Sequence, residues 1–134
     1  RFFAETLQPD KLFSSAKNTK TYLHQRLRDE PNEVFAVLLL DSQHRLICFK
    51  KLFFGSVNMA SVHPRVIVQS ALACNAAAII LSHNHPSGVA EPSHADKHIT
   101  QKIIQALELI DVTVLDHIIV GDSESVSFAE RGLI

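Results

Sequence analysis

The chain is poor in cysteine: it has two, Cys48 and Cys74, which cannot form a disulfide framework and do not lie in a CxxC motif. We therefore expect two buried thiols in a reducing compartment, which points to the cytoplasm. No apolar run approaches the roughly 20 residues of a membrane-spanning helix, and the longest covers residues 34–40. No secretory signal is visible at the start. Because the chain begins at Arg1 and not at Met, we expect it to be part of a longer protein.

An excess of charge of one sign is also missing. Thirteen basic and 14 acidic residues leave a formal net charge of −1, which argues against a strongly basic domain that wraps nucleic acid. With 134 residues, 46% of them hydrophobic, the composition is that of one ordinary globular domain. A chain of this length buries roughly two-thirds of its unfolded surface. Histidine is unusually frequent, with eight residues.

Hydrophobic periodicity divides the chain into alternating helices and strands. After an apolar lead-in, we expect helices over residues 14–28, from Pro64 to about residue 77 and over 93–110, and strands over 33–41, 45–54, 77–83, 112–120 and 125–128. The second helix has so little polar surface that we expect it to be covered on more than one side. The order α-β-β-α-β-α-β-β indicates one α/β unit.

The third predicted strand ends in His83-Asn84-His85, and Ser93 and Asp96 follow across a Pro/Gly loop. Side chains two apart on an extended strand point to the same face, so the two imidazoles converge. Asp96 lies in the first turn of the next predicted helix and can return a carboxylate beside them. Two histidines and one carboxylate are the protein ligands of a catalytic zinc site, which leaves the fourth position for water. Other divalent ions would also be accepted.

The same residues also have a purely structural interpretation. Ser93 and Asp96 form an S-x-x-D pattern close to a capping box. An acidic residue in a first helical turn is stabilising without any metal, and an isolated HxH is more often incidental than a ligand pair. The coincidence of both patterns at the end of a buried strand favours a site.

A hydrolytic zinc site also needs a carboxylate that takes the proton of the attacking water. The candidates that we consider are Glu5, Glu30, Glu33, Glu91 and Glu108. Glu33 is the best placed, because it opens a buried apolar strand where an unpaired charge is costly. A solvated carboxylate at a strand end is the alternative interpretation.

Four further histidines have simpler explanations. His94 and His98 are four residues apart on one predicted helix, but the HExxH pattern is not met because Ala95 follows His94, so we expect surface histidines. His117 lies in an apolar strand and is expected to be a core histidine, with a supporting contact to the site as the alternative. His63 is expected at a helix start.

Glu33, His83, His85, Ser93 and Asp96 together match the JAMM (MPN+) metallopeptidase motif, an upstream Glu followed by HxH-x7-S-x2-D. The wider sequence resembles the RadC family of bacterial JAMM-like domains. The stretches that carry this resemblance are SVNMASVHPR (56–65), AAIILSHNHPSG (77–88), EPSHAD (91–96) and VLDHIIVGD…VSFAERGL (114–133). The resemblance covers roughly residues 30–134, and we divide the chain into an N-terminal lead-in and helix (1–30) and a RadC-type JAMM domain (31–134).

The resemblance implies the JAMM α/β sandwich, a mixed central sheet flanked by helices that is related to the cytidine-deaminase fold. It also implies that His83, His85 and Asp96 bind Zn²⁺, that Glu33 is the general base, and that Ser93 helps to hold the oxyanion of the tetrahedral intermediate. The implied reaction is hydrolysis of a peptide or isopeptide bond in a peptide or protein substrate. Zinc deaminases need HxE followed by PCxxC, which is missing, so we exclude that chemistry.

Two alternatives from other functional classes stay open. The RadC family carries a DNA-repair name, and its full-length members resemble a helix-hairpin-helix DNA-binding module joined to this domain. A nucleic-acid-interacting module with DNA as partner is therefore one alternative, although the near-neutral charge speaks against it. The other is a non-catalytic protein-interaction domain that keeps the site for stability. The sequence leaves the oligomeric state and the scissile bond open.

Overall fold

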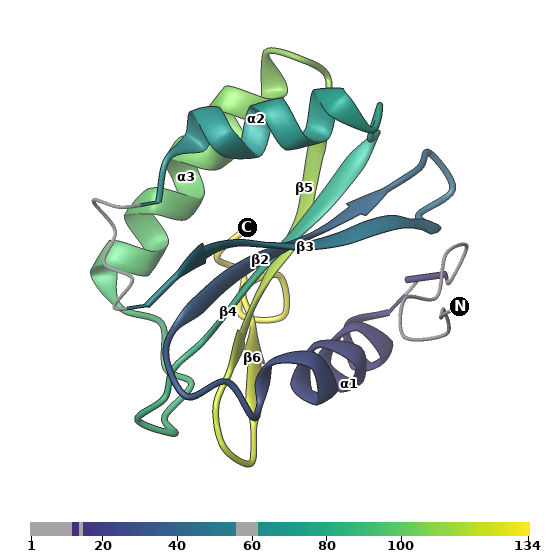
Figure 1. The fold of residues 1–134 in the computed structure, drawn as a ribbon. Helices are drawn as coiled ribbons and strands as arrows, with labels where there is room; N and C mark the ends of the chain where they lie inside the picture. Colours follow the sequence, from purple (N-terminus) through teal and green to yellow (C-terminus); the bar gives the residue numbers. More distant parts are fainter. Residues whose placement is uncertain (1–11, 14, 56–61) are drawn as a thin grey trace.

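The computed structural model describes residues 12–13, 15–55 and 62–134. Its elements are α1 (Ala16–Leu27), β2 (Val34–Leu40), β3 (Leu46–Phe54), α2 (Pro64–Ala73), β4 (Ala78–Asn84), α3 (His94–Glu108), β5 (Thr113–Val120) and β6 (Ser125–Ser127). The strands form a sheet in the order β3-β2-β4-β5-β6 (Figure 1). β4 and β5 run parallel, and the other neighbouring strands run antiparallel. The predicted order of elements is confirmed.

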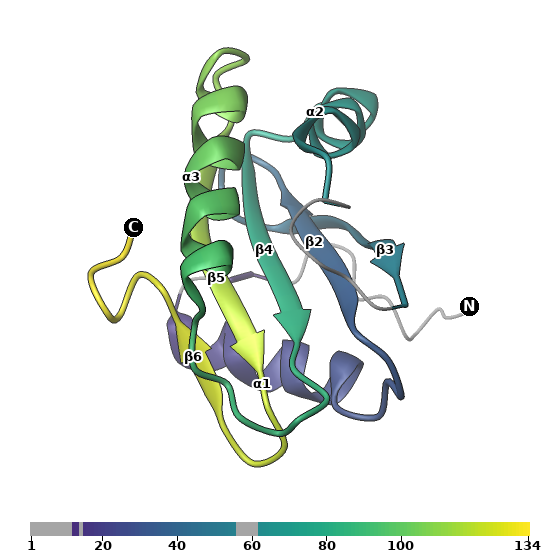
Figure 2. The ribbon, with the colours of Figure 1, turned by 90° about the vertical axis from the view of Figure 1, so that its left-hand side faces the viewer.

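Helices cover both faces of this sheet. α1 lies on one face, and α2 and α3 lie side by side on the other (Figures 1 and 2). The predicted α/β sandwich, a mixed central sheet flanked by helices, is therefore confirmed. Within the described ranges, no helix is both long and apolar enough to cross a membrane.

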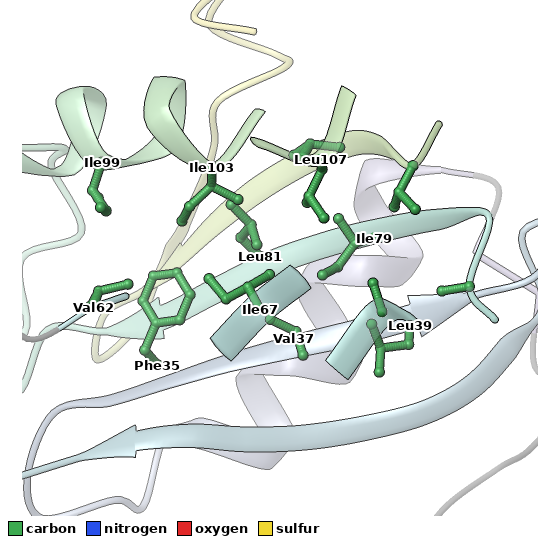
Figure 3. Close-up of a cluster of buried hydrophobic side chains, with 14 residues drawn as sticks. Phe35, Val37, Leu39, Val62, Ile67, Ile79, Leu81, Ile99, Ile103 and Leu107 are labelled. Atoms are coloured by element: carbon green, nitrogen blue, oxygen red, sulfur yellow. The ribbon is translucent and has the colours of Figure 1, made fainter. Parts of the chain in front are cut away.

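The odd-numbered residues of β2 and β4 face α2 and α3. All seven residues of each strand are buried, and alternation sends every second side chain to this face. The cluster between the sheet and the two helices includes Phe35, Val37, Leu39, Ile67, Ile79, Leu81, Ile99, Ile103 and Leu107 (Figure 3). Burying one such side chain contributes about 1.5–3 kcal/mol. His83 continues the odd-numbered series of β4, so this face also carries the predicted site.

The even-numbered residues of β2 and β4 face α1, whose Leu23 and Leu27 are fully buried. Ser15 caps this helix by accepting a hydrogen bond from the backbone N–H of Asn18 at 3.2 Å. Ser14 and residues 1–11 of the expected lead-in lie outside the described residues. Phe13 is buried against the same cluster. The division of the chain near residue 30 stays a prediction.

Two predictions about burial were wrong. α2 buries one face, through Ile67, Ser70 and Ala71, while Leu72 is 59% exposed. The helix lies at the outside of its layer next to α3, so its apolar composition does not mean that it is enclosed (Figure 2). Cys48 and Cys74 are free but half-buried, since both lie at the margin of the core cluster.

Candidate metal centre

β4 and α3 bring together three of the predicted site residues. His83 lies in β4, His85 follows the end of that strand, and Asp96 lies in the first turn of α3. One ligand atom from each lies within 4.8 Å of the others. His83 Nε2 is 3.2 Å from Asp96 Oδ1, His85 Nε2 is 3.4 Å from Asp96 Oδ2, and the two Nε2 atoms are 3.0 Å apart. The cluster could therefore hold a metal ion.

The backbone of the following loop fixes the ring of His85. Its Nδ1 lies 2.8 Å from the carbonyl oxygen of Val89. A carbonyl only accepts hydrogen bonds, so Nδ1 carries a proton and donates it. Nε2 of His85 is then the nitrogen that faces Asp96. The backbone N–H of His85 donates to Val120 O at 2.9 Å, which ties the start of the loop to the end of β5.

Asp96 forms the predicted helix cap and also faces the two histidines. Its Oδ2 accepts from the backbone N–H of Ser93 at 2.9 Å, and its own N–H donates to Ser93 Oγ at 3.0 Å, which is a complete capping box. Asp96 is 3% exposed. The cap therefore orients the same carboxylate that faces the two histidines.

The charge of Asp96 is stabilised by its neighbours. Burial alone would raise the pKa of this carboxyl, but the neighbouring side chains of His83 and His85 and the hydrogen bond from the Ser93 N–H outweigh burial and hold the pKa well below its usual value. The hydrogen bond to Asp96 is in turn the largest cause of a raised pKa at His85. The Asp96 carboxylate therefore keeps its negative charge at neutral pH, which favours a cation beside it.

Glu33 lies beside this cluster. The antiparallel pairing places Phe35 opposite His83, and two further residues along this register place Glu33 opposite His85. Glu33 is half-buried, and its charge contributes to the raised pKa of His85. Its odd number puts it on the same face as Phe35 and His83. The register and this charge interaction thus place Glu33 near His85, and its role as general base stays a prediction.

Asn84 holds the backbone on both sides of Glu33. Its Oδ1 accepts from the N–H of Val34 at 2.7 Å, and its Nδ2 donates to the carbonyl of Asn32 at 3.1 Å. No role for Asn84 was predicted from the sequence. Its position at the end of a buried strand could have predicted such contacts, because a buried amide needs hydrogen-bond partners for both its oxygen and its nitrogen.

The remaining histidines lie as expected, and one of them contacts the cluster from behind. His94 and His98 are exposed on α3, and His63 is the N-cap residue of α2. His117 is completely buried in the core, with its Nε2 2.8 Å from His83 Nδ1. Thr100, whose Oγ1 lies 2.6 Å from His117 Nδ1, was missed by the sequence analysis.

The loop between β4 and α3 is fastened to the β5–β6 turn through two glycines. Gly88 has a φ of +94°, and its carbonyl accepts from the N–H of Asp122 at 3.1 Å. A Cβ on Gly121 would lie 2.5 Å from the carbonyl oxygen of Gly88. Real Cβ atoms essentially never come this close to another heavy atom, so only glycine fits at position 121 without moving the loop.

Gly121→Ala is expected to lower both the melting temperature and the affinity for Zn²⁺, the latter by about 10-fold, as for other changes behind metal ligands. The reason is that the displaced loop carries the Val89 carbonyl that orients His85. Gly132→Ala is the matched control, since its φ of +72° makes alanine strained but nothing lies within 4 Å of the added Cβ. It should lower the melting temperature alone. Unchanged zinc affinity in Gly121→Ala would contradict this role of the loop.

The chain is similar to a known protein family and to curated proteins over nearly its whole length. Residues 13–133 match the family model described as a RadC-like JAB domain. The chain belongs to this family. The RadC-like JAB domain described here is 66% identical over its 134 residues to a UPF0758 protein of Pseudoalteromonas atlantica, of which it covers 60%. It is 60% identical over 132 residues to a UPF0758 protein of Tolumonas auensis, of which it covers 59%.

A third relative, a UPF0758 protein of Nitrosococcus oceani, is 55% identical over 134 residues, again with 60% of its length covered. The domain thus spans about 60% of the length of the curated relatives that it matches. The resemblance to the RadC family is confirmed, and the matched region includes α1.

Proposed function

We propose that this RadC-like JAB domain is a zinc-dependent hydrolase that cleaves a peptide or isopeptide bond. The observation that carries the proposal is the convergence of His83 Nε2, His85 Nε2 and the Asp96 carboxylate within 4.8 Å. This donor set suits Zn²⁺ at a catalytic site, because three protein ligands leave one position open to solvent or substrate. A structural zinc site would use a fourth protein ligand, usually a cysteine thiolate.

The chemistry of the donor set supports a resident ion. The Nδ1 proton of His85 is directed to a backbone carbonyl, and the buried Asp96 is ionised. His83, His85 and Asp96 would hold the ion. When bound, it would supply a Lewis acid that polarises a carbonyl and lowers the pKa of a water molecule.

The other two predicted residues would handle the proton and the developing charge. Glu33 would take a proton from the attacking water and deliver it to the leaving amine, as a general base and then a general acid. Ser93 Oγ accepts from the Asp96 N–H, which leaves its hydroxyl proton to donate to an oxyanion. Both roles are part of the proposal.

The experiment is a cleavage screen with the zinc-loaded protein. A library of peptides and of isopeptide-linked peptides is incubated with it, and new termini are identified by mass spectrometry. We expect cleavage that stops after treatment with a chelator and returns when Zn²⁺ is added. A protein that takes up zinc but produces no new termini above the chelated control would contradict the proposal. Salt-dependent binding to DNA in parallel would favour the nucleic-acid alternative.

A further inference from the structure

Three buried side chains, those of Thr100, His117 and His83, are linked by hydrogen bonds. The links lie on the side of the His83 ring that faces away from His85 and Asp96. Thr100 Oγ1 lies 2.7 Å from the carbonyl oxygen of Asp96 and 2.6 Å from His117 Nδ1. His117 Nε2 lies 2.8 Å from His83 Nδ1. Thr100 and His117 have no exposed surface, and His83 is 1% exposed. The three side chains therefore satisfy one another without water.

The direction of these hydrogen bonds follows from the first of them. The hydroxyl of Thr100 has one proton, and the carbonyl of Asp96 can only accept, so Thr100 donates there. The same hydroxyl oxygen must then accept from His117 Nδ1–H. A neutral imidazole protonated on Nδ1 has its lone pair on Nε2, which accepts from His83 Nδ1–H. The free lone pair of His83 is thus on Nε2, the atom that faces His85 and Asp96.

Packing holds the intermediate ring in place. Phe128 stacks on His117 with the ring centroids 4.6 Å apart, and Phe35 meets the same ring edge-on at 5.7 Å. A ring that does not turn can transmit one hydrogen-bond direction from Thr100 to His83.

We propose that Thr100 and His117 are positioning residues that fix the tautomer of His83 and present its Nε2 lone pair to a divalent ion. The identity of the ion rests on the function proposed above, whereas the tautomer is a property of the metal-free chain. Without the ion, the same hydrogen bonds would still prepare the site before binding.

Removing the Thr100 hydroxyl tests this role. In Thr100→Val the shape is kept, but His117 Nδ1–H loses its acceptor, and the ring is expected to move its proton to Nε2. His83 then carries its proton on Nε2 and has to move it to Nδ1 before Nε2 can bind the ion. We expect the affinity for Zn²⁺ to fall by about 10- to 100-fold, as for other residues behind metal ligands. Thr100→Ser keeps the hydroxyl and should restore the wild-type affinity.

Thr19→Val is the matched control. Thr19 is also a buried helical threonine, and its hydroxyl donates to the carbonyl four residues earlier, that of Ser15, at 2.9 Å. It lies on α1, on the opposite face of the sheet (Figure 1). The control should lose stability as Thr100→Val does, yet bind Zn²⁺ like the wild type.

The second readout is the nitrogen-15 chemical shifts of the imidazoles in the metal-free protein. They are measured at a pH above the usual histidine pKa of about 6.5. We expect both His83 and His117 to be protonated on Nδ1 in the wild type and on Nε2 in Thr100→Val. A wild type with His83 protonated on Nε2 would overturn the proposal, even if Thr100→Val fails to fold. Wild-type affinity in a folded Thr100→Val would overturn it too. A protein with the expected tautomers that cleaves nothing would contradict the hydrolase proposal and leave the positioning role standing.

Discussion

Asp96→Asn is expected to lower the affinity for Zn²⁺ by more than about 100-fold. Substituting a residue that only supports a metal ligand already lowers metal affinity by about 10- to 100-fold. The substitution removes the negative charge that faces His83 and His85. Asparagine keeps the size of the side chain and an oxygen that can accept from the Ser93 N–H, so the helix cap survives. The loss should therefore appear in metal content, measured by mass spectrometry, and in competition with a chelator, while the helix content stays that of the wild type.

Asp111→Asn is the control for removing one carboxylate. Asp111 lies just after α3 with a φ of +59°, a conformation that asparagine tolerates well. This variant should bind one equivalent of zinc, as one three-ligand site implies. If Asp96→Asn also bound zinc with the wild-type affinity, Asp96 would be reduced to its role as a helix cap.

Glu33→Gln is expected to slow hydrolysis by about 10²- to 10⁴-fold, the usual contribution of a general base. Glutamine has nearly the same shape but cannot take up a proton. Zinc content should stay unchanged, because the three residues whose ligand atoms converge are His83, His85 and Asp96. The rate is measured on a peptide identified in the cleavage screen, with zinc content determined on the same sample.

Glu91→Gln provides the comparison. Glu91 precedes α3 and forms an exposed ion pair with Arg131 Nη1 at 2.9 Å, so it belongs to the same region of the chain without facing the cluster. Its variant should cleave at the wild-type rate. Equal rates for Glu33→Gln and the wild type would mean that Glu33 is a half-buried strand-end carboxylate and that another group takes the proton.

The local patterns of the sequence were sufficient to predict most of the fold. The apolar runs of β2 and β4 predicted buried strands, and the S-x-x-D pattern predicted the start of α3 at Ser93. The convergence of His83, His85 and Asp96 was also predictable, because alternation along a strand and one short loop determine it. These features depend on residues that are close in the sequence.

Contacts between distant segments were not predictable in the same way. Asn84 bonds to residues 50 and 52 positions earlier, and Thr100 meets His117 across two elements. No periodicity links such pairs. The apolar composition of α2 likewise indicated a buried face but not how many elements cover the helix, which is why that prediction was wrong.

The amide of Asn84 has a mechanical consequence for the site. Within residues 83–85 the two imidazoles point to one side of the sheet. The Asn84 side chain between them points to the other side and forms hydrogen bonds with the backbone at the start of β2. These two hydrogen bonds tie residues 83–85 to the backbone on both sides of Glu33, so a movement of the β4–α3 loop does not separate His83 from Glu33 while the hydrogen bonds hold. Inserting a single residue between the histidines would turn one imidazole toward α1, so their spacing of two is itself a geometric requirement.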